Sequence, residues 1–329
     1  MALVDPASLI LTGTYKFGDL YGNDSQDHTW GLLEFGEEDE TSFRDLALTG
    51  VDAVAMRLHT EGDTARSPRM RELLTPHFGY HDELRVIARD SRRTWGAIAL
   101  FRDRADTPFS EAEVAYAASL SGAIAAGLRS GLLAQLTAAA PITPAGPAVV
   151  IVDGDDAVRQ VSVGAEQVLV ELASEPGMSD ASGIVGALVA GARRYAAGLV
   201  DTLPRARVRV PSGRWIVMHA SPLAGVGAGS SNVVVTMEEA RPPEIVPLLV
   251  EAFDLTARES EVVQLVLQGL DTKEIAAGLH MSRYTVQDHL KAIFEKTSVR
   301  SRRELVAKVF FDHYAPRLGD PVTIHGELA

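Results

Sequence analysis

The clearest pattern of apolar and polar positions lies in residues 255–311, where apolar residues recur every three or four positions. This spacing places them on one face of a helix. Thr256 and Glu259 form a capping-box pattern ahead of the first such stretch, and Gly269 suits the left-handed residue that ends a helix. The pattern therefore predicts a first helix that starts after Thr256 and stops at Gly269.

Three more short helices are predicted behind the first. Asp271 and Glu274 repeat the capping-box pattern, and Ser282 is a suitable N-cap after the short turn that follows. Ser301 with Glu304 predicts the cap of the last helix. Such an ordered set indicates a helix-turn-helix module. The residues predicted to face inward are Val262, Val263, Leu265, Val266, Leu267, Ile275, Ala276, Leu279, Val286, Leu290, Ile293, Leu305, Val306, Val309 and Phe310.

Two strands and one long helix are predicted upstream of this module. Residues 84–88 and 95–101 are apolar runs on either side of a polar turn, which indicates a pair of strands. Ser110 and Glu113 form a capping box at the start of the helix. A stripe of mostly small residues along that helix suits close packing or a partner helix. The stripe consists of Val114, Ala117, Ala118, Ser121, Ile124, Ala125 and Leu128.

A second region of strands and helices follows a change in composition. Residues 139–147 are rich in Ala, Pro and Gly, which indicates a linker. A helical pattern then reaches about residue 199, and another helix is predicted after Pro243. The strands predicted in this region lie at 148–152, 157–163, 206–210, 214–220 and 232–237.

The length and composition suggest a cytoplasmic protein of several domains. A chain of 329 residues is too long for one ordinary core, so two or three domains are expected. The absence of cysteine excludes disulfides and thiolate zinc sites and fits a cytosolic protein. The N-terminus does not resemble a secretory signal, and no apolar run approaches the length of a membrane span, so no membrane association is expected.

The charge is distributed unevenly along the chain. The net charge is −13, yet residues 254–311 carry nine basic and eight acidic residues, so the negative charge lies almost wholly upstream. Lysine shows the same contrast, because none occurs between Lys16 and Lys273. Phosphate attraction supplies most non-specific affinity for DNA, so a near-neutral module on an acidic body predicts weak non-specific binding.

The helix-turn-helix segment closely resembles the C-terminal DNA-binding domain of LuxR-type transcription regulators. The resemblance implies that the third helix enters the major groove, that the fourth helps to form a dimer through Leu305, Val306 and Val309, and that the DNA site is a rough inverted repeat. The matching residues are Leu255, Thr256, Arg258, Glu259, Gly269, Glu274, Ile275, Ala276, Leu279, Ser282, Thr285, Val286, His289, Leu290, Ile293, Phe294, Lys296, Val299, Ser301 and Arg302.

Position on the third helix suggests which residues contact DNA. Ser282 and Thr285 lie at its start, where hydroxyls and backbone N–H groups hold phosphate. Gln287 and Asp288 stand where the family often has basic residues, and with Lys291 they are the candidates for base contacts. The alternative is that Asp288 faces solvent or neutralises Lys291. The predicted phosphate clamps are Lys273, Arg283, Lys291, Arg300 and Arg302, and Tyr284 completes the predicted DNA-binding set.

The upstream regions resemble two kinds of sensory domain. Residues 84–133 resemble the C-terminal half of GAF domains, and the order of two strands, helices and three strands after the linker resembles a PAS domain. The expected fold class is therefore α+β and multidomain, with GAF-like and PAS-like sheet domains before an all-α four-helix LuxR-type module. The expected boundaries are 1–138 GAF-like, 139–147 linker, 148–241 PAS-like, 242–253 connecting helix, 254–313 helix-turn-helix and 314–329 tail.

Several kinds of chemistry were weighed and set aside. Asp153, Asp155 and Asp156 predict a turn, because a phosphoacceptor pocket also needs a distal lysine. The Gly-rich run at 225–229 lacks the lysine of a phosphate loop. Alternating Arg205, Arg207 and Arg209 predict a solvated strand face, with an anionic ligand as the alternative. No cofactor, metal or catalytic residue is predicted, although haem or a small-molecule ligand is not excluded. The scattered histidines considered as haem ligands are His28, His59, His77, His81 and His219.

The sequence thus favours a non-enzymatic regulator that binds double-stranded DNA as a homodimer. The leading hypothesis is that the upstream domains sense a small molecule or partner and control DNA binding. The alternative is a constitutive regulator whose upstream domains only dimerise. An enzyme with an accessory helix-turn-helix would need a set of catalytic residues, and none is recognised in the sequence. A sigma factor would need basic, aromatic-rich helical segments that the upstream chain lacks.

Overall fold

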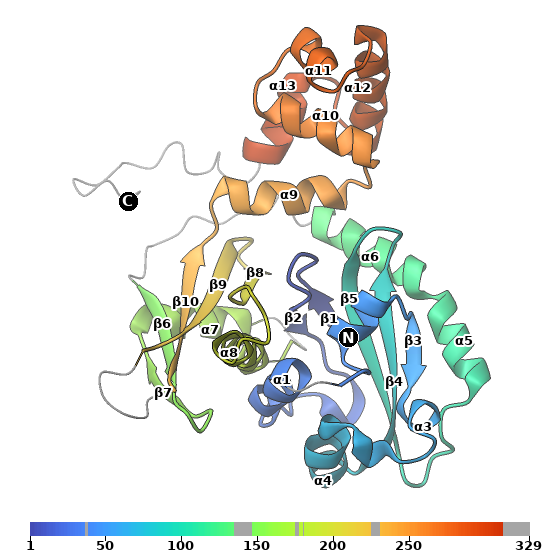
Figure 1. Cartoon of the computed structure of the whole chain (residues 1–329), viewed down its shortest axis with the longest axis vertical. Coiled ribbons are helices and arrows are strands. Elements are labelled where there is room, and N and C mark those ends of the chain that lie inside the picture. The colour runs from blue at the N-terminus through green and yellow to red at the C-terminus, as the bar shows by residue number, and fades with distance from the viewer. Residues whose placement is uncertain (37–38, 135–146, 175–177, 180, 225–230, 312–329) are drawn as a thin grey trace. The chain divides into compact units, whose positions relative to one another are not determined.

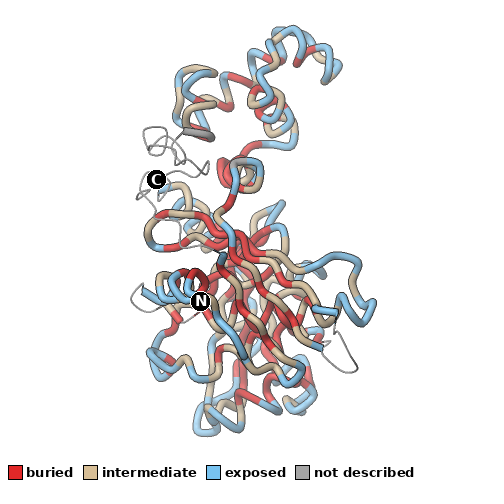
Figure 2. The backbone as a smooth tube through the Cα atoms, turned by 90° about the vertical axis from the view of Figure 1, so that its left-hand side faces the viewer, coloured by how far each residue is buried: buried red, intermediate tan, exposed pale blue. Residues whose placement is uncertain are grey.

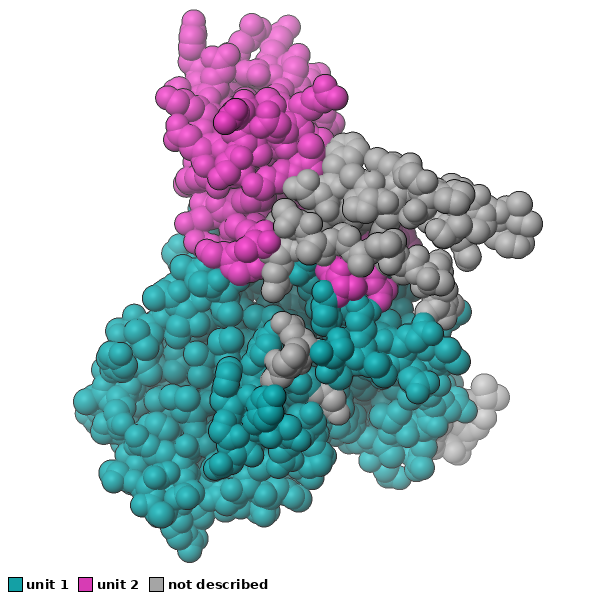
Figure 3. Space-filling view, turned by 180° about the vertical axis from the view of Figure 1, so that it is seen from behind, with its two compact units in different colours: residues 1–128, 145–211, 215–239 teal, residues 129–144, 212–214, 240–329 magenta. Residues whose placement is uncertain are grey.

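The computed structural model divides the chain into two compact units (Figure 3). Unit 1 comprises residues 1–128, 145–211 and 215–239, and unit 2 comprises residues 129–144, 212–214 and 240–329. The structure describes residues 1–36, 39–134, 147–174, 178–179, 181–224 and 231–311. Most of the expected linker at 139–147, the Gly-rich run at 225–229 and the tail at 314–329 lie outside the described residues.

The first sheet of unit 1 has five strands among the described residues, in the order β2-β1-β5-β4-β3, and every pair is antiparallel (Figure 1). The two strands expected from the sequence are confirmed as its long central pair, β4 and β5. The strands are β1 Ala2–Val4, β2 Leu11–Thr14, β3 Ala53–Ala55, β4 Tyr80–Arg89 and β5 Thr94–Asp103.

Alternation along β4 gives the two faces of this sheet different surroundings. Leu84 and Val86 pack with Phe109 and Ala117 on the side of helix α5. Glu83, Arg85 and Ile87 occupy the odd-numbered positions, so their side chains project from the opposite face of the sheet. The helical elements around the sheet are η1 Gly18–Leu20, α1 Asp27–Gly36, α2 Phe43–Thr49, α3 Met56–His59, η2 Thr64–Arg66, η3 Met70–Leu74, α4 Thr75–Phe78, α5 Glu111–Ser119 and α6 Ser121–Ala134.

The long helix expected after Ser110 is divided in two. The predicted capping box of Ser110 and Glu113 is confirmed at the start of α5. At Leu120 the backbone N–H donates to the Ala117 carbonyl, which tightens the turn and separates α5 from α6. Ala117, Ser121 and Ala125 of the predicted stripe are buried, so the stripe packs within the chain.

Residues 111–134 are also long and apolar enough, by length and composition alone, to be a candidate membrane span. Core helices of soluble proteins are often long and apolar enough to meet the same criteria. The break at Leu120 and the ion pair between Arg129 and Asp254 are ordinary features of such a helix. The segment therefore gives only weak support for a membrane span.

The second sheet of unit 1 has five described strands in the order β7-β6-β10-β9-β8, again all antiparallel. The five expected strands are present, but β7 stops earlier than predicted. Ser162 accepts the Ala165 N–H and is the N-cap of the next helix, so residue 163 is already helical. The elements are β6 Ala148–Val152, β7 Val158–Val161, α7 Val163–Leu172, α8 Ser182–Ala196, β8 Arg205–Arg209, β9 Trp215–Pro222 and β10 Val233–Glu239.

Helices α7 and α8 bury one face of the second sheet. Much of the buried backbone lies along the strands of the sheets (Figure 2). Helix α8 also packs against α1, so the two sheets share one unit (Figure 1). The crossing depends on glycine, because a Cβ on Gly31 would lie 2.1 Å from the Gly183 carbonyl oxygen. A Cβ on Gly186 would lie 2.3 Å from the His28 carbonyl oxygen. Only glycine allows the two backbones to approach this closely.

The expectation of a solvated arginine face on β8 is wrong for Arg207. This side chain is 8% exposed, and its Nε donates to Asp5 Oδ2 at 3.1 Å. The Arg207 backbone N–H also donates to Asp5 Oδ2, at 2.8 Å. Arg207 therefore joins the loop after β1 to the second sheet instead of facing solvent or a ligand.

The remaining acidic and histidine patterns of unit 1 are structural. The predicted turn is confirmed, because Asp153 Oδ1 accepts the N–H groups of Asp155 and Ala157. His77 lies in α4 and His81 in β4, separated by the left-handed Gly79, so they do not share a helix face. Within the described residues, no group of three or more His, Asp or Glu side chains could hold a metal ion.

Unit 2 contains the predicted helix-turn-helix. The capping boxes at Thr256 and Asp271 are confirmed, and Gly269 has a φ of 87° after the first helix. Ser301 caps the last helix as expected, but the Glu304 carboxylate accepts the N–H of Arg300 rather than that of Ser301. The helices are α9 Pro242–Ala252, α10 Ala257–Leu267, α11 Thr272–Gly278, α12 Arg283–Thr297, α13 Arg302–Val306 and its continuation η5 Ala307–Phe311.

The core of unit 2 follows the predicted inward-facing set. Val262, Ile275, Val286, Ile293 and Leu305 are each fully buried within it. Thr297 is buried as well, and its hydroxyl is satisfied there by donating a hydrogen bond to the Ile293 carbonyl at 2.7 Å. The side chain of Phe310, also predicted to face inward, lies outside the described residues.

Candidate nucleic-acid interface and ligand cavity

Helix α12 begins with a fixed set of polar contacts. Ser282 Oγ accepts the Thr285 N–H at 3.1 Å, and the two hydroxyl oxygens lie 2.9 Å apart. Both side chains are exposed. The start of the helix thus presents hydroxyls and backbone N–H groups to solvent, as a phosphate-binding helix end requires.

One face of α12 carries most of the predicted DNA-binding side chains. Tyr284, Gln287, Asp288 and Lys291 are spaced by three, one and three residues, which places them on one face. All four are exposed, Tyr284 to 81%. The opposite face carries the buried Val286, Leu290 and Ile293. We call Tyr284, Gln287, Asp288 and Lys291 the α12 stripe.

Four basic side chains near or on this stripe form no ion pair or hydrogen bond with the described residues. Lys273, Arg283, Lys291 and Arg300 are exposed, and within the described residues their side chains form neither ion pairs nor hydrogen bonds. Arg302 differs, because it is half-buried and its Nε and Nη2 are buried without a hydrogen-bond partner among the described residues. The structure thus leaves four predicted phosphate clamps exposed, and Arg302 less so.

Asp288 is exposed and forms no ion pair with any described residue. The alternative therefore holds in its first form, in which Asp288 faces solvent, and not in its second, in which Asp288 neutralises Lys291. An exposed carboxylate on this face repels phosphate and can accept a hydrogen bond from a cytosine amino group.

Two other basic residues stabilise the module from within. Lys296 Nζ lies 2.7 Å from Glu259 Oε2, and Arg258 Nη2 donates to the Leu279 carbonyl. Burial by itself raises the pKa of Glu259, but hydrogen bonds from Lys296 and Thr256 outweigh it and leave that pKa below its ordinary value. These contacts fix α10 against α12 and the turn before it, so neither basic residue is available for phosphate.

The predicted dimerisation residues lie mostly inside the module. Leu305 and Val309 are 0% and 1% exposed, whereas Val306 is half-buried. Val306 also lines a surface groove with Val266, Leu270 and Arg302. Dimerisation through this helix stays a prediction, and within the described residues Val306 is the member of the predicted set with exposed surface.

A second candidate site, missed in the sequence, is a cavity of about 560 Å³ within unit 1. It is lined by residues of β2, α1 and β5 and by a group from the second sheet region, which comprises Leu172, Met178, Ser179, Ala181, Gly183 and Ile184. The volume falls in the range of about 300–1,000 Å³ that is typical of small-molecule sites. The lone N-terminal lysine, Lys16, lines it and was the one signal that sequence reasoning could have followed.

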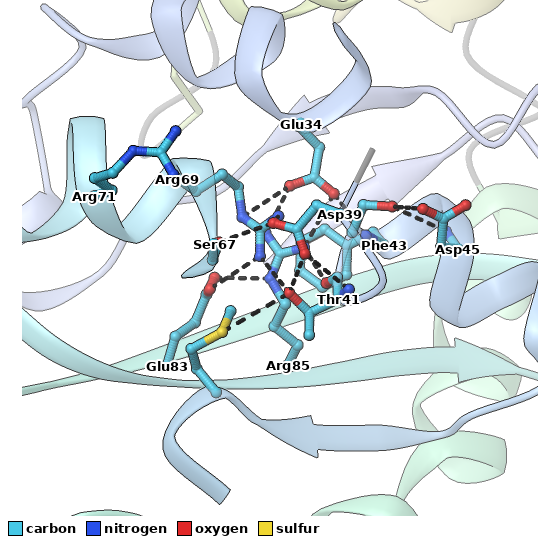
Figure 4. Close-up of polar contacts among 12 residues, drawn as sticks. Glu34, Asp39, Thr41, Phe43, Asp45, Ser67, Arg69, Arg71, Glu83 and Arg85 are labelled. Atoms are coloured by element: carbon cyan, nitrogen blue, oxygen red, sulfur yellow. Dashed lines mark hydrogen bonds and ion pairs between the residues drawn. The ribbon is translucent and has the colours of Figure 1, made fainter. Parts of the chain in front are cut away.

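A buried network of charges lies beside the cavity (Figure 4). Arg85 of β4 donates to Glu34 Oε2 at 2.6 Å and to Glu83 Oε1 at 2.8 Å, and Arg69 lies 2.6 Å from Asp39. Glu34, which also lines the cavity, comes from α1. Burial raises the pKa values of Glu34 and Asp39, but the facing arginines outweigh it and hold both below their ordinary values.

This network holds several elements of unit 1 together. Arg69, Arg85 and Glu83 are 0% exposed, and their hydrogen bonds join α1, the loop before α2, the segment before η3 and β4. Arg85 also lies over the Phe43 ring, 3.9 Å from its centroid. A charge inside a protein is tolerated only when it is paired and hydrogen-bonded.

Comparison with known proteins identifies the helix-turn-helix. Residues 254–309 match the family described as bacterial regulatory proteins, luxR family. A putative HTH-type transcriptional regulator of Aeromonas salmonicida is 46% identical over 59 residues, which are 18% of this chain and 30% of that protein. The transcriptional regulatory protein DesR of Bacillus subtilis is 42% identical over 67 residues, which are 20% of this chain and 34% of that protein. The similarity thus spans about a third of these relatives.

A longer match and two solved structures extend the comparison. The uncharacterized transcriptional regulatory protein YhcZ of Bacillus subtilis is 30% identical over 126 residues, 38% of this chain and 54% of that protein. A dimer of the LuxR-type receptor VqmA from Vibrio cholerae shares 16% identity over 50% of this chain and 82% of that one, with a TM-score of 0.23. A complex of Vibrio cholerae VqmA with ligand and DNA shares 15% sequence identity over 51% of this chain and 83% of that one, with a TM-score of 0.24. Scores this low define no common arrangement of the domains.

Proposed function

With residues 254–309 forming a LuxR-type helix-turn-helix domain, we propose that the whole chain is a DNA-binding transcription regulator. The observation that supports this most strongly is the α12 stripe, which is exposed, unpaired and flanked by basic side chains that have no internal partner in the described residues. In this proposal α12 lies in the major groove. Gln287, Asp288 and Lys291 contact bases, and Lys273, Arg283 and Arg300 contact phosphates.

We further propose that unit 1 controls this DNA binding through a small molecule. The cavity supports control over constitutive binding, because a regulator whose upstream part only dimerises has no need of a partly open site of about 560 Å³. A ligand shifts the equilibrium only if it binds one arrangement of the protein more tightly than the other. The effector is therefore expected to change DNA affinity, and DNA is expected to change effector affinity by the same factor.

We also propose that the regulator binds DNA as a homodimer. A helix-turn-helix dimer contacts two half-sites related by a two-fold axis, so the DNA site is expected to be a rough inverted repeat. Val306 and the groove beside it are the surface that this proposal assigns to the contact. Replacing Val306 with Glu should then weaken DNA binding while leaving the fold intact.

The first experiment selects DNA sequences from a random library with the full chain and then measures affinity for the selected site by fluorescence anisotropy. Lys273→Ala with Arg283→Ala should reduce affinity at least tenfold and lower the slope of log K against log salt by about two, one for each lost phosphate contact. Arg104→Ala is the matched control, because Arg104 is an exposed arginine of unit 1.

The result is decisive in either direction. Loss of affinity in the double variant, with Arg104→Ala unchanged and both proteins folded by circular dichroism, supports the interface. Enrichment of no sequence, or equal DNA affinity in all three proteins, would overturn the proposal that α12 binds DNA.

A further inference from the structure

The cavity of unit 1 has an aromatic wall. Trp30, Tyr80 and Phe101 line it. The ring centroids of Tyr80 and Phe101 lie 4.8 Å apart and nearly parallel, and Trp30 meets Phe101 edge-on at 5.7 Å. Phe78 stacks behind Tyr80 at 5.9 Å and fixes its position. Aromatic rings that line a cavity provide a surface suited to flat apolar groups and to cations.

The lysine at the cavity is already fully engaged. Lys16 is 7% exposed, and its Nζ donates to the Asn23 carbonyl at 2.6 Å, to Asp24 at 2.8 Å and to Asp27. An ammonium group has three N–H donors, so none is left for a ligand. The Met1 amino group, also at the wall, donates to the Tyr15 carbonyl at 2.9 Å, and burial lowers its pKa.

The negative charge at the cavity is not balanced in the same way. Asp19 and Asp103 line it, are exposed, and form no ion pair with any described residue. Burial raises the pKa of the Tyr80 phenol, and the nearby negative charge of Asp19 raises it further. Asp106 is a third carboxylate of the lining, and its charge also acts on Arg102, which is paired with Glu113. Glu34 is neutralised by Arg85 and Arg69.

We propose that this cavity binds a small organic cation, a molecule with a flat apolar body and a protonated amino group. The aromatic wall and the carboxylates of Asp19 and Asp103 are complementary to such a cation. An anion meets the negative charge of Asp19 and Asp103 and finds no N–H group left to donate on Lys16, so carboxylate and phosphate ligands are disfavoured. The regulatory consequence rests on the proposed function, but the binding itself does not.

The test uses the full chain and three probes with the same ring. These are 2-phenylethylamine, 2-phenylethanol and phenylacetate, which are cationic, neutral and anionic at pH 7. Titration is followed by calorimetry and by tryptophan fluorescence, to which Trp30 at the cavity contributes. The amine should bind saturably and at least about tenfold more tightly than the alcohol, a difference of about 1.4 kcal/mol, and the acid should not bind.

Two variants locate the site. Asp19→Asn with Asp103→Asn should lower the affinity for the amine at least about fivefold and leave that for the alcohol unchanged, because only the charge is removed. Ala99→Trp should fill the cavity and abolish binding of both. Asp201→Asn, at an exposed position outside the lining, is the matched control and should change nothing.

The outcomes separate this inference from the proposed function. Absence of saturable amine binding up to about 10 mM, or equal or tighter binding of the acid, overturns the cationic ligand even if the same protein binds its selected DNA. Amine binding without any change in DNA affinity supports the cavity inference and overturns control by this ligand. If the carboxylate variant binds the amine as tightly as the unmodified chain, the assignment to Asp19 and Asp103 is wrong.

Discussion

Arg69 and Arg85 of unit 1 carry the same charge as Arg283 and Lys291 of unit 2, but their surroundings are opposite. The first pair is 0% exposed and paired with Glu34, Asp39 and Glu83. The second pair is exposed and forms no ion pair with any described residue. Arg69 and Arg85 thus connect elements of the fold, whereas Arg283 and Lys291 remain at the surface.

This difference indicates what each substitution should disturb. A buried charge that loses its partner leaves an uncompensated ion inside the protein, so its removal costs stability. An exposed, unpaired charge contributes little to folding and is available to a partner molecule. All three tryptophans, Trp30, Trp95 and Trp215, belong to unit 1, so their fluorescence reports the unfolding of that unit alone.

The largest expected effect is that of breaking the buried network. Arg85→Ala leaves Glu34 and Glu83 with one arginine between them, and it should lower the free energy of unfolding of unit 1 by about 3–5 kcal/mol. Urea unfolding followed by tryptophan fluorescence measures this. Arg71→Ala, which breaks the exposed pair with Glu72, is the control and should cost about 0–1 kcal/mol. Equal losses in the two variants would remove the distinction between buried and exposed charges.

A smaller loss is expected where the two sheets of unit 1 meet. Gly186→Ala places a methyl group 2.3 Å from the His28 carbonyl oxygen, and the resulting displacement of α1 from α8 should cost about 1–3 kcal/mol. Gly127→Ala is the matched control, because a Cβ there meets no atom within 4 Å. In a helix it should stabilise by up to about 1 kcal/mol. A stabilising Gly186→Ala would contradict the close crossing of the helices.

The exposed stripe should show the reverse behaviour, a change in recognition without a change in folding. Gln287→Ala should relax the preference for one base of the selected DNA site by about 1–3 kcal/mol. Binding to a set of single-base variants of that site measures it. Gln264→Ala, an exposed glutamine on α10, is the control. An unchanged base preference in Gln287→Ala would exclude this side chain from sequence recognition.

The smallest expected effect is the loss of stability of unit 1 at acidic pH. The pKa values of Glu34 and Asp39 are lower in the folded chain than their ordinary values of about 4, so their contribution to stability is complete above about pH 5. It is lost as the pH falls through the folded-state pKa values. Unfolding free energies of unit 1 measured from pH 7 to pH 3 should therefore change little down to about pH 5 and then decline. In Arg85→Ala the decline should be smaller, because a Glu34 pKa closer to its ordinary value leaves less stability to lose, and coincident profiles would show that Arg85 does not lower the pKa of Glu34.

Much of unit 2 could be predicted from the sequence because its signals are local. Capping boxes at Thr256 and Asp271, the left-handed Gly269 and the three-and-four spacing of apolar residues act within one or two helical turns. The α12 stripe follows from the same periodicity. Strands β4 and β5 were predictable for a similar reason, since both are long apolar runs on either side of a polar turn.

The cavity and the buried network of unit 1 were not predicted, because they join residues that are distant in the sequence. Glu34 and Arg85 are 51 positions apart, and Asp5 and Arg207 are 202 apart. Nothing in the alternation of β8 distinguishes an arginine that faces solvent from one that meets an aspartate of another segment. The pair of charges at Glu83 and Arg85 within an otherwise apolar strand was the available signal, and only its partners show what it does.

The sequence by itself determined the helix-turn-helix, its caps, the outward face of α12 and the contrast between an acidic body and a near-neutral module. These depend on contacts between near neighbours, which residue order alone specifies. Only the tertiary structure decided where the arginines of unit 1 point, how closely α1 and α8 approach, and that an aromatic cavity lies between β2, α1 and β5. Those features depend on which distant segments meet, because burial and pairing, rather than residue type, set the role of each charge.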